Sequence, residues 1–232
     1  MASHCAVPDL TVSSPYAVER EAMVRAVPSR RAEFLTGRTA ARAALAELGV
    51  SVGPIARRPD RSPDWPPGIV GSITHTRGLC AAVVARHRRV WAAPLGLGID
   101  VEVDAVLDDA VVHRVLTTRE RAALGAPIGR DAVVAFSAKE SLFKAINPAT
   151  GVWLEANEVE VELVRDDHFG TDEIDGGTIG VLSWARTVPG FEPADAIGRW
   201  ARVGPWVVTA MVLSSSSAGS GRDRSTATLS PI

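Results

Sequence analysis

The sequence has little cysteine and no long apolar run. Cys5 and Cys80 are its two cysteines, and neither has a partner at the spacing of a metal site. They give no support to a disulfide framework or a zinc site, and they fit a reducing compartment. No apolar run reaches the roughly 18 residues that a membrane helix needs, and the opening segment MASHCAVPDL lacks the basic stretch and apolar core of a signal peptide. We therefore expect a cytoplasmic protein with no membrane-spanning segment.

A strong net charge is also missing. The formal net charge is −2 over 232 residues, which argues against a dedicated nucleic-acid binder but leaves room for a local basic pocket. With 46% hydrophobic and 22% charged residues, the chain is long enough to bury a sizeable core. One large globular domain or two small lobes would fit this length.

Lysine is scarce, because nearly all basic residues are arginines. The two lysines, Lys139 and Lys144, lie close together in one segment. A compact ammonium group that can transfer a proton would explain why lysine is retained there. Chance combined with helix preference is the alternative.

The chain divides into alternating helical and strand-like segments. A Pro- and Arg-rich loop covers 56–68, a Thr-Thr-Arg-Glu capping box begins a helix at 117, and the Ser- and Gly-rich tail 214–232 is expected to be disordered. We predict two α+β lobes, 1–103 and 104–213, without a detectable sequence repeat. Periodicity predicts helices at 29–49, 117–124 and 130–146 and strand-like runs at 69–75, 79–86, 95–103, 158–164, 178–186 and 198–213.

An acidic strand carries the first candidate site. In Gly-Ile-Asp-Val-Glu, residues 98–102, the period of a strand sends Asp100 and Glu102 to one face. Two neighbouring carboxylates repel each other, and Mg²⁺ typically takes one or two carboxylates together with phosphate oxygens. A solvated strand edge is the alternative interpretation.

A helical segment carries the second candidate site. In Phe-Ser-Ala-Lys-Glu-Ser-Leu-Phe-Lys, residues 136–144, Glu140 and Lys144 are neighbours on one helix face. Such a pair is often only a surface ion pair. The apolar surroundings and the presence of both lysines favour a functional role.

Hydroxyl, imidazole and guanidinium groups form a third set. Thr74 and His75 end a predicted strand, and Arg30 and Arg38 lie on the first long helix. Guanidinium groups suit phosphate monoesters because they donate two parallel hydrogen bonds. Taken alone, an ordinary charged helix face and a structural histidine explain these residues equally well.

In this order, the segments resemble the 4′-phosphopantetheinyl transferases that serve siderophore, surfactin and polyketide synthesis. The family motifs G-(I/V)-D-(I/V)-E and (F/W)-(S/C/T)-x-K-E-(A/S)-x-x-K match residues 98–102 and 136–144. Residues 30–38 and 65–75 resemble earlier motifs of the enterobactin-synthetase branch. The resemblance runs from about residue 30 to about residue 155. It implies an α+β fold of two similar lobes related by a pseudo-two-fold axis, each with a small antiparallel sheet packed on a long helix.

The resemblance also implies a reaction and its partners. The enzyme would transfer 4′-phosphopantetheine from coenzyme A to a serine of an apo acyl or peptidyl carrier protein and release adenosine 3′,5′-bisphosphate. It would act as a monomer, in polyketide, nonribosomal peptide or siderophore biosynthesis. The exposed Arg119 or Arg121 could meet the carrier.

Residue roles follow from the same resemblance. Asp100, Glu102 and Glu140 would surround Mg²⁺, and Glu140 would also be the base for the carrier serine. Lys144 would hold or protonate the leaving phosphate. The groups that would contact coenzyme A are Arg30, Arg38, Arg61, Thr74, His75, Asp100 and Lys144, with Arg61 in a loop of variable length.

Two rival functions use the same residues differently. A magnesium-dependent phosphodiester hydrolase acting on coenzyme A-like nucleotides would release adenosine bisphosphate without a carrier protein. A non-catalytic module that binds coenzyme A would need the basic residues but would have no use for Asp100, Glu102 and Glu140 together.

Overall fold

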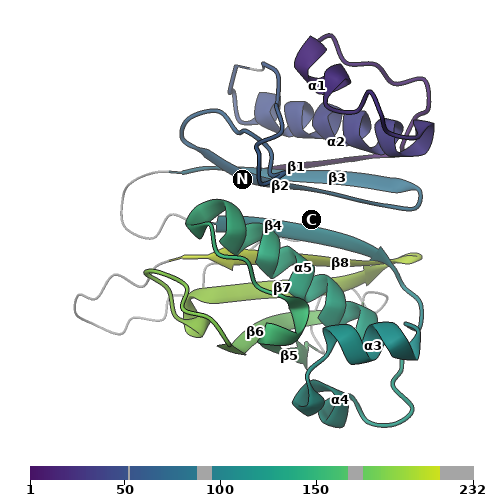
Figure 1. Ribbon diagram of the computed structural model, residues 1–232, viewed down its shortest axis with the longest axis vertical. Coiled ribbons are helices and arrows are strands. Elements are labelled where there is room, and N and C mark those ends of the chain that lie inside the picture. The colour runs from purple at the N-terminus through teal and green to yellow at the C-terminus, as the bar shows by residue number, and fades with distance from the viewer. Residues whose placement is uncertain (52, 88–95, 167–174, 215–232) are drawn as a thin grey trace.

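The computed structural model describes residues 1–51, 53–87, 96–166 and 175–214. Two antiparallel sheets, each packed on a long helix, form two lobes (Figure 1). The predicted α+β fold is confirmed. None of the described helices is both long enough and apolar enough to cross a membrane.

The first lobe is a three-stranded sheet covered by a 20-residue helix. Helix α2 buries Ala41 and Leu45, which pack with Ile55 and with Val84 of the sheet. The strand-like runs predicted at 69–75 and 79–86 form a hairpin, in which β2 pairs antiparallel with β3. The strand order is β1-β3-β2, and the elements are β1 (Ala2–Ala6), α1 (Ala17–Glu21), α2 (Pro28–Glu47), β2 (Ile69–Thr76) and β3 (Leu79–Arg86).

The second lobe is a five-stranded sheet packed on α5. Helix α5 buries Leu142 and Ile146 against Trp200 and Met211 of the sheet, which gives this lobe the larger apolar core. The strand order is β4-β8-β7-β6-β5. The elements are β4 (Gly96–Val103), α3 (Asp109–Val115), α4 (Thr118–Leu124), α5 (Asp131–Thr150), β5 (Val159–Arg165), β6 (Gly176–Trp184), β7 (Ala196–Val203) and β8 (Trp206–Leu213), with short 3₁₀ turns at Ala156–Glu158 and Pro193–Asp195.

Strand β4 lies between the two lobes and has a different neighbour on each face. Leu97 and Ile99 pack against Val83 and Ala85 of β3, and these four residues join the lobes. On the other face α5 approaches so closely that a Cβ atom on Gly98 would lie 1.8 Å from the carbonyl oxygen of Ser141. A glycine at this position therefore lets the acidic strand and the second motif helix touch backbone to backbone.

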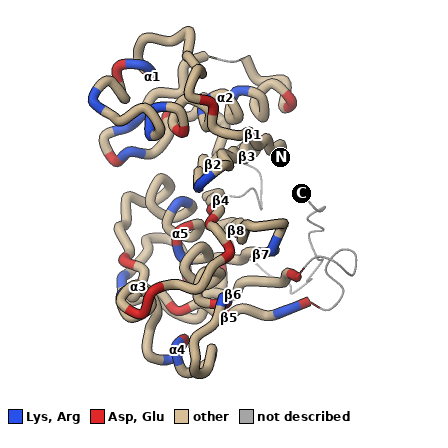
Figure 2. The backbone as a smooth tube through the Cα atoms, turned by 90° about the vertical axis from the view of Figure 1, so that its right-hand side faces the viewer, with Lys and Arg blue, Asp and Glu red and all other residues tan. Residues whose placement is uncertain are grey.

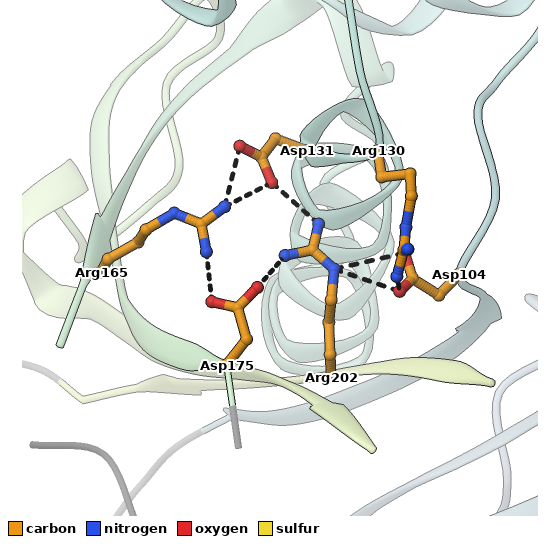
Figure 3. Close-up of polar contacts among 6 residues, drawn as sticks. All are labelled: Asp104, Arg130, Asp131, Arg165, Asp175 and Arg202. Atoms are coloured by element: carbon orange, nitrogen blue, oxygen red, sulfur yellow. Dashed lines mark hydrogen bonds and ion pairs between the residues drawn. The ribbon is translucent and has the colours of Figure 1, made fainter. Parts of the chain in front are cut away.

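A network of charged groups ties the end of β4 to the start of α5 (Figure 3). Arg202 on β7 reaches Asp104 through Nε at 3.2 Å and Asp131 through Nη2 at 2.8 Å. It also pairs with Asp175, while Arg165 bonds to both Asp131 and Asp175. The network therefore holds the end of β4 and the start of α5 together. These two elements carry Asp100, Glu102 and Glu140.

Several boundaries differ from the sequence prediction. The run 198–213 is two strands, because Gly204 and Pro205 form a turn within it. The run 95–103 was expected to end the first lobe, but β4 pairs with β8 in the second sheet, a long-range choice that local sequence does not reveal. Elements β1, α1 and α3 were not predicted. The tail prediction falls on 214–232, of which 215–232 lie outside the described residues.

The capping box at α4 is confirmed. Thr117 Oγ1 accepts a hydrogen bond from Glu120 N at 3.2 Å, and Thr117 N donates to Glu120 Oε2 at 2.7 Å. The reciprocal bonds satisfy two backbone donors that the first helical turn leaves free.

Candidate active site

Asp100 lies at the centre of the candidate site and is buried. Its Oδ1 accepts hydrogen bonds from Thr74 Oγ1 at 3.0 Å and from Lys144 Nζ at 2.6 Å, and its Oδ2 accepts one from Ser137 Oγ at 2.9 Å. Ser137 is in turn 2.9 Å from Thr209 Oγ1. The carboxylate is thus held by β2, α5 and, through Ser137, β8.

Lys144 joins the two lobes through one ammonium group. Besides Asp100, its Nζ donates to the Ile99 carbonyl at 3.2 Å and to Thr74 Oγ1 at 3.3 Å. Its side chain retains 26% exposure, so it faces the junction and is not part of the core. The sequence-predicted Thr74, Asp100 and Lys144 are therefore brought together.

Glu102 and Glu140 are partly buried near Asp100 and accept no hydrogen bond from the part of the chain that the structure describes. Burial and then the charge of Asp100 raise the pKa of Glu102 to about 7, with Lys144 opposing them. Burial, Asp100 and Glu155 likewise raise the pKa of Glu140. Negative charge is therefore in excess over the single ammonium group on this side of the junction.

The donor chemistry of these carboxylates fits a hard divalent cation. The described side chains do not, however, include three or more His, Cys, Asp or Glu groups gathered closely enough to hold a metal ion. Asp100 already accepts bonds at both oxygens, while Glu102 and Glu140 have oxygens without a donor. Any cation here would take only part of its ligands from the protein.

An exposed aromatic side chain borders the acidic groups. Trp153 is 57% exposed, lies edge-on to Phe143 with 4.7 Å between ring centroids, and donates from Nε1 to Glu155 at 2.8 Å. These contacts fix an apolar surface next to the carboxylate that raises the pKa of Glu140.

Arg38 is the centre of positive charge in the first lobe. Its guanidinium lies 3.5 Å from the centroid of Phe34, and its buried Nε has no hydrogen-bond partner in the described structure. Burial, together with the charges of Arg30, Arg57 and Arg42 and against the opposing charge of Glu19, lowers the pKa of Arg38 to about 10. Basic and acidic segments are interspersed around α2, and acidic segments lie at β4 and α5 alongside the two lysines of α5 (Figure 2).

His75 connects this basic group to the junction. Arg30 Nη1 contacts His75 Nε2, and His75 Nδ1 lies 3.5 Å from Glu33 Oε2. Burial and the Arg30 charge lower the pKa of His75 below its usual value. Arg30 Nη1 also donates to Glu33 Oε2 at 3.2 Å, so this carboxylate pairs with both the guanidinium and the imidazole.

A cavity of about 150 Å³ opens between the lobes. Arg58, Trp65 and Gly71 line it from the first lobe, and Leu97 and Lys144 from the second. Lys144 therefore faces both the acidic group and a space large enough for part of a ligand.

Two residues singled out by sequence lie elsewhere. Arg61 is exposed in a turn at φ 73°, and in the described structure its one polar contact is the bond from its backbone N to the Arg58 carbonyl. Lys139 is 1% exposed and bonds to Glu120 Oε2 at 2.6 Å and to the Val115 carbonyl at 2.8 Å. The first lysine of the motif, Lys139, is thus buried and holds structural contacts.

The sequence prediction missed four residues that the structure brings to the site or its edge. Ser137 lies inside the second motif but was not singled out, and Thr209 lies outside every motif. Arg57 is four residues from Arg61 in the same loop. The sequence alone does not indicate that Arg57 lies near Arg38 while Arg61 is exposed in a turn. The four residues are Arg57, Ser137, Glu155 and Thr209.

Comparison with known proteins identifies the class. A family model described as the 4′-phosphopantetheinyl transferase N-terminal domain matches residues 18–85, and one described as the 4′-phosphopantetheinyl transferase superfamily matches residues 96–185. The chain belongs to the 4′-phosphopantetheinyl transferase superfamily, as its motifs predicted.

Individual relatives agree with this assignment. The 4′-phosphopantetheinyl transferase Svp of Streptomyces mobaraensis is 40% identical over 211 residues, which cover 89% of this chain and 81% of that protein. The 4′-phosphopantetheinyl transferase PptT of Mycobacterium tuberculosis is 34% identical, with 86% of each chain covered. Enterobactin synthase component D of Salmonella typhimurium is 37% identical over 123 residues, or 51% of this chain and 49% of that protein.

Proposed function

We propose that this enzyme transfers 4′-phosphopantetheine from coenzyme A to a serine of an apo acyl or peptidyl carrier protein, with Mg²⁺ bound at the acidic side of the lobe junction. One observation carries the proposal. Guanidinium groups gather around Arg38 in the first lobe, and carboxylates gather around Asp100 in the second. A polyanionic nucleotide together with a divalent cation would neutralise both.

The proposed metal ligands are Asp100, Glu102 and Glu140. Mg²⁺ usually keeps several waters and takes one or two carboxylates with substrate phosphates, so it does not need a closed cage of protein ligands. Burial and then repulsion from Asp100 raise the pKa values of Glu102 and Glu140, and a cation here would relieve both effects. When bound, Mg²⁺ would stabilise the negative charge that develops on the departing phosphate.

The proposed nucleotide contacts come from both lobes. Arg30, Arg38, Thr74 and His75 would hold phosphate and nucleotide oxygens. The buried Nε of Arg38 has no hydrogen-bond partner in the described structure, which makes this guanidinium a candidate for an anion contact. Arg57 joins Arg61 as the loop candidate because Arg57 lies close enough to lower the pKa of Arg38.

Two residues of α5 would carry the proton chemistry. Glu140 takes the proton of the carrier serine, directly or through water, as a carboxylate without a competing hydrogen-bond donor can do. The serine oxygen then bonds to the phosphorus of the phosphopantetheine, and the pyrophosphate P–O bond breaks. Lys144 would stabilise or protonate the leaving adenosine 3′,5′-bisphosphate, which the bond to Asp100 positions it to do.

The proposal includes a monomeric enzyme in the cytoplasm, based on the low cysteine content and on the presence of both lobes in one chain. The pathway, whether polyketide, nonribosomal peptide or siderophore synthesis, depends on the carrier.

Mass spectrometry of an apo carrier protein, after incubation with the enzyme, coenzyme A and Mg²⁺, tests the proposal. An EDTA control and a carrier whose acceptor serine is replaced by alanine complete the experiment. We expect a metal-dependent gain of one phosphopantetheine on the serine. Release of adenosine bisphosphate without modification of any carrier would instead indicate a hydrolase, and coenzyme A binding without release would indicate a binding module.

A further inference from the structure

Glu19 is a completely buried carboxylate with a full set of hydrogen bonds. It lies on α1, is 0% exposed, and accepts from Arg42 Nη1 at 2.6 and 2.9 Å, from Ser14 Oγ at 2.5 Å and from the backbone N of Ile55 at 2.8 Å. No sequence motif marks it. A buried charge with every lone pair engaged indicates a residue that fixes its partners in place.

The partners of Glu19 lead to the basic group from two directions. Ile55 begins a short loop. In this loop Asp64 N donates to the Ala56 carbonyl, and Arg57 forms an isolated antiparallel β-bridge with Pro63. The bond at Ile55 therefore anchors the base of the loop two residues before Arg57. Arg42 lies one helical turn after Arg38 on α2, so the bond at Arg42 fixes the helix beside Arg38.

The negative charge of Glu19 and the contacts that it makes would have opposite effects on a nearby anion site. Glu19 raises the pKa of Arg38, while Arg30, Arg57 and Arg42 lower it, which places this carboxylate within electrostatic reach of the cluster. By Coulomb's law alone, a negative charge here weakens the binding of a polyanion. A buried acid at this point must therefore contribute through geometry if it favours binding.

We propose that Glu19 is a positioning residue for coenzyme A binding, because it joins α1, α2 and the base of the Arg57 loop into one rigid frame. The inference rests on the proposed function. It extends that function by making part of the affinity for coenzyme A depend on Glu19, a buried residue that acts through its partners.

Calorimetric titration of coenzyme A in the presence of Mg²⁺ tests the inference on wild type and on Glu19→Gln. We expect coenzyme A to bind about tenfold more weakly to the variant. Removing a group that orients a metal-ligating side chain typically costs about 10- to 100-fold in affinity, and we take the lower end by analogy. In steady state the KM for coenzyme A should rise, kcat should be restored at saturating coenzyme A, and the KM for the carrier should not change. Ser14→Ala, a milder change that removes one bond to the same carboxylate, should weaken binding less and with the same sign.

The matched control is Glu120→Gln, which breaks the buried Glu120–Lys139 pair of the other lobe. Circular dichroism at the temperature of the titration must show all variants folded. Equal loss of affinity in Glu120→Gln, or unchanged or tighter binding in both Glu19→Gln and Ser14→Ala, would overturn the inference and leave the proposed function standing. Absence of coenzyme A binding by the wild type would overturn the proposed function itself.

Discussion

Arginines gather on one side of the lobe junction, and carboxylates gather on the other. Around α2, burial and three neighbouring arginines lower the pKa of Arg38 to about 10. Around β4 and α5, burial and neighbouring carboxylates raise the pKa of Glu102 to about 7. Each side alone is destabilised by its own charges, because like charges near a low-dielectric interior repel.

The difference suits the two sides to groups of opposite charge. The basic side suits phosphate groups, and the acidic side suits a cation and a proton acceptor. Lys144 reaches across with bonds to Asp100 of the second lobe and Thr74 of the first, and Thr74 itself donates to Asp100. The following changes break or sharpen this division, from the largest expected effect to the smallest.

Glu140→Gln breaks the acidic side at the proposed base. Transfer should fall by about 10²–10⁴-fold because an amide cannot take the serine proton, while coenzyme A still binds. Mass spectrometry of the carrier measures transfer, and titration measures binding. Glu162→Gln, an exposed acid on β5, should leave both unchanged. A fully active Glu140→Gln enzyme would remove this residue from the role of base.

Gly98→Ala separates the acidic strand from α5. The added Cβ meets the Ser141 carbonyl at 1.8 Å, a backbone group that cannot turn away, so we expect a loss of about 3 kcal/mol in the free energy of unfolding. Chemical denaturation checks this value. Gly180→Ala on β6, where a Cβ meets nothing within 4 Å, is the matched control. Equal stability of the two variants would contradict the close approach.

Arg38→Met breaks the basic side. Coenzyme A affinity should fall about tenfold, near the lower end of what a hydrogen bond to a charged group is worth. Stability should hold or rise, because a buried guanidinium with an orphaned Nε is removed. Arg31→Met on the same helix is the control, since that side chain is exposed and its bonds go to the Val24 and Ala26 carbonyls. Unchanged affinity in Arg38→Met would remove Arg38 from the phosphate contacts.

Acid titration probes the charged network of Figure 3, which joins the end of β4 to the start of α5. Burial raises the pKa of Asp131 and Asp175, but bonds from Arg165 and Arg202 outweigh it and lower both values. This stability is present above the unfolded aspartate pKa of about 3.9 and is lost as the pH falls through the lower folded values.

Arg165→Met should flatten that pH dependence below about pH 5. The half-exposed pairs limit the effect to under about 1 kcal/mol. Denaturant midpoints between neutral and acidic pH measure it. An identical acid slope in wild type and variant would show that the network carries no pH-dependent stability.

Sequence predicted the family, the α+β fold and the main helices because these depend on local patterns. The Asp100 to Glu102 strand and the Phe136 to Lys144 helix follow from periodicity. The membership of β4 in the second sheet does not, since strand pairing joins residues more than a hundred positions apart. The role of Lys139 is hidden for the same reason, because its partner Glu120 lies on another helix.

The candidate site was predictable only in part. Thr74, Asp100 and Lys144 meet as their motifs suggest. Arg57 and Arg61 share one loop and one residue type, so the turn that exposes Arg61 cannot be recognised from composition. Glu19 belongs to a weakly patterned segment, and its importance appears only once Ser14, Arg42 and Ile55 are brought together.

The scarcity of lysine has a practical consequence. With Lys139 sealed in the core at 1% exposure, the side-chain amine open to a water-borne reagent is that of Lys144 at 26% exposure. An amine-directed label would mark the N-terminus and one point at the junction of the lobes. If the proposed contact of Lys144 with coenzyme A holds, the ligand should protect this amine from the label, which would report binding without a carrier, a radioisotope or a mutation.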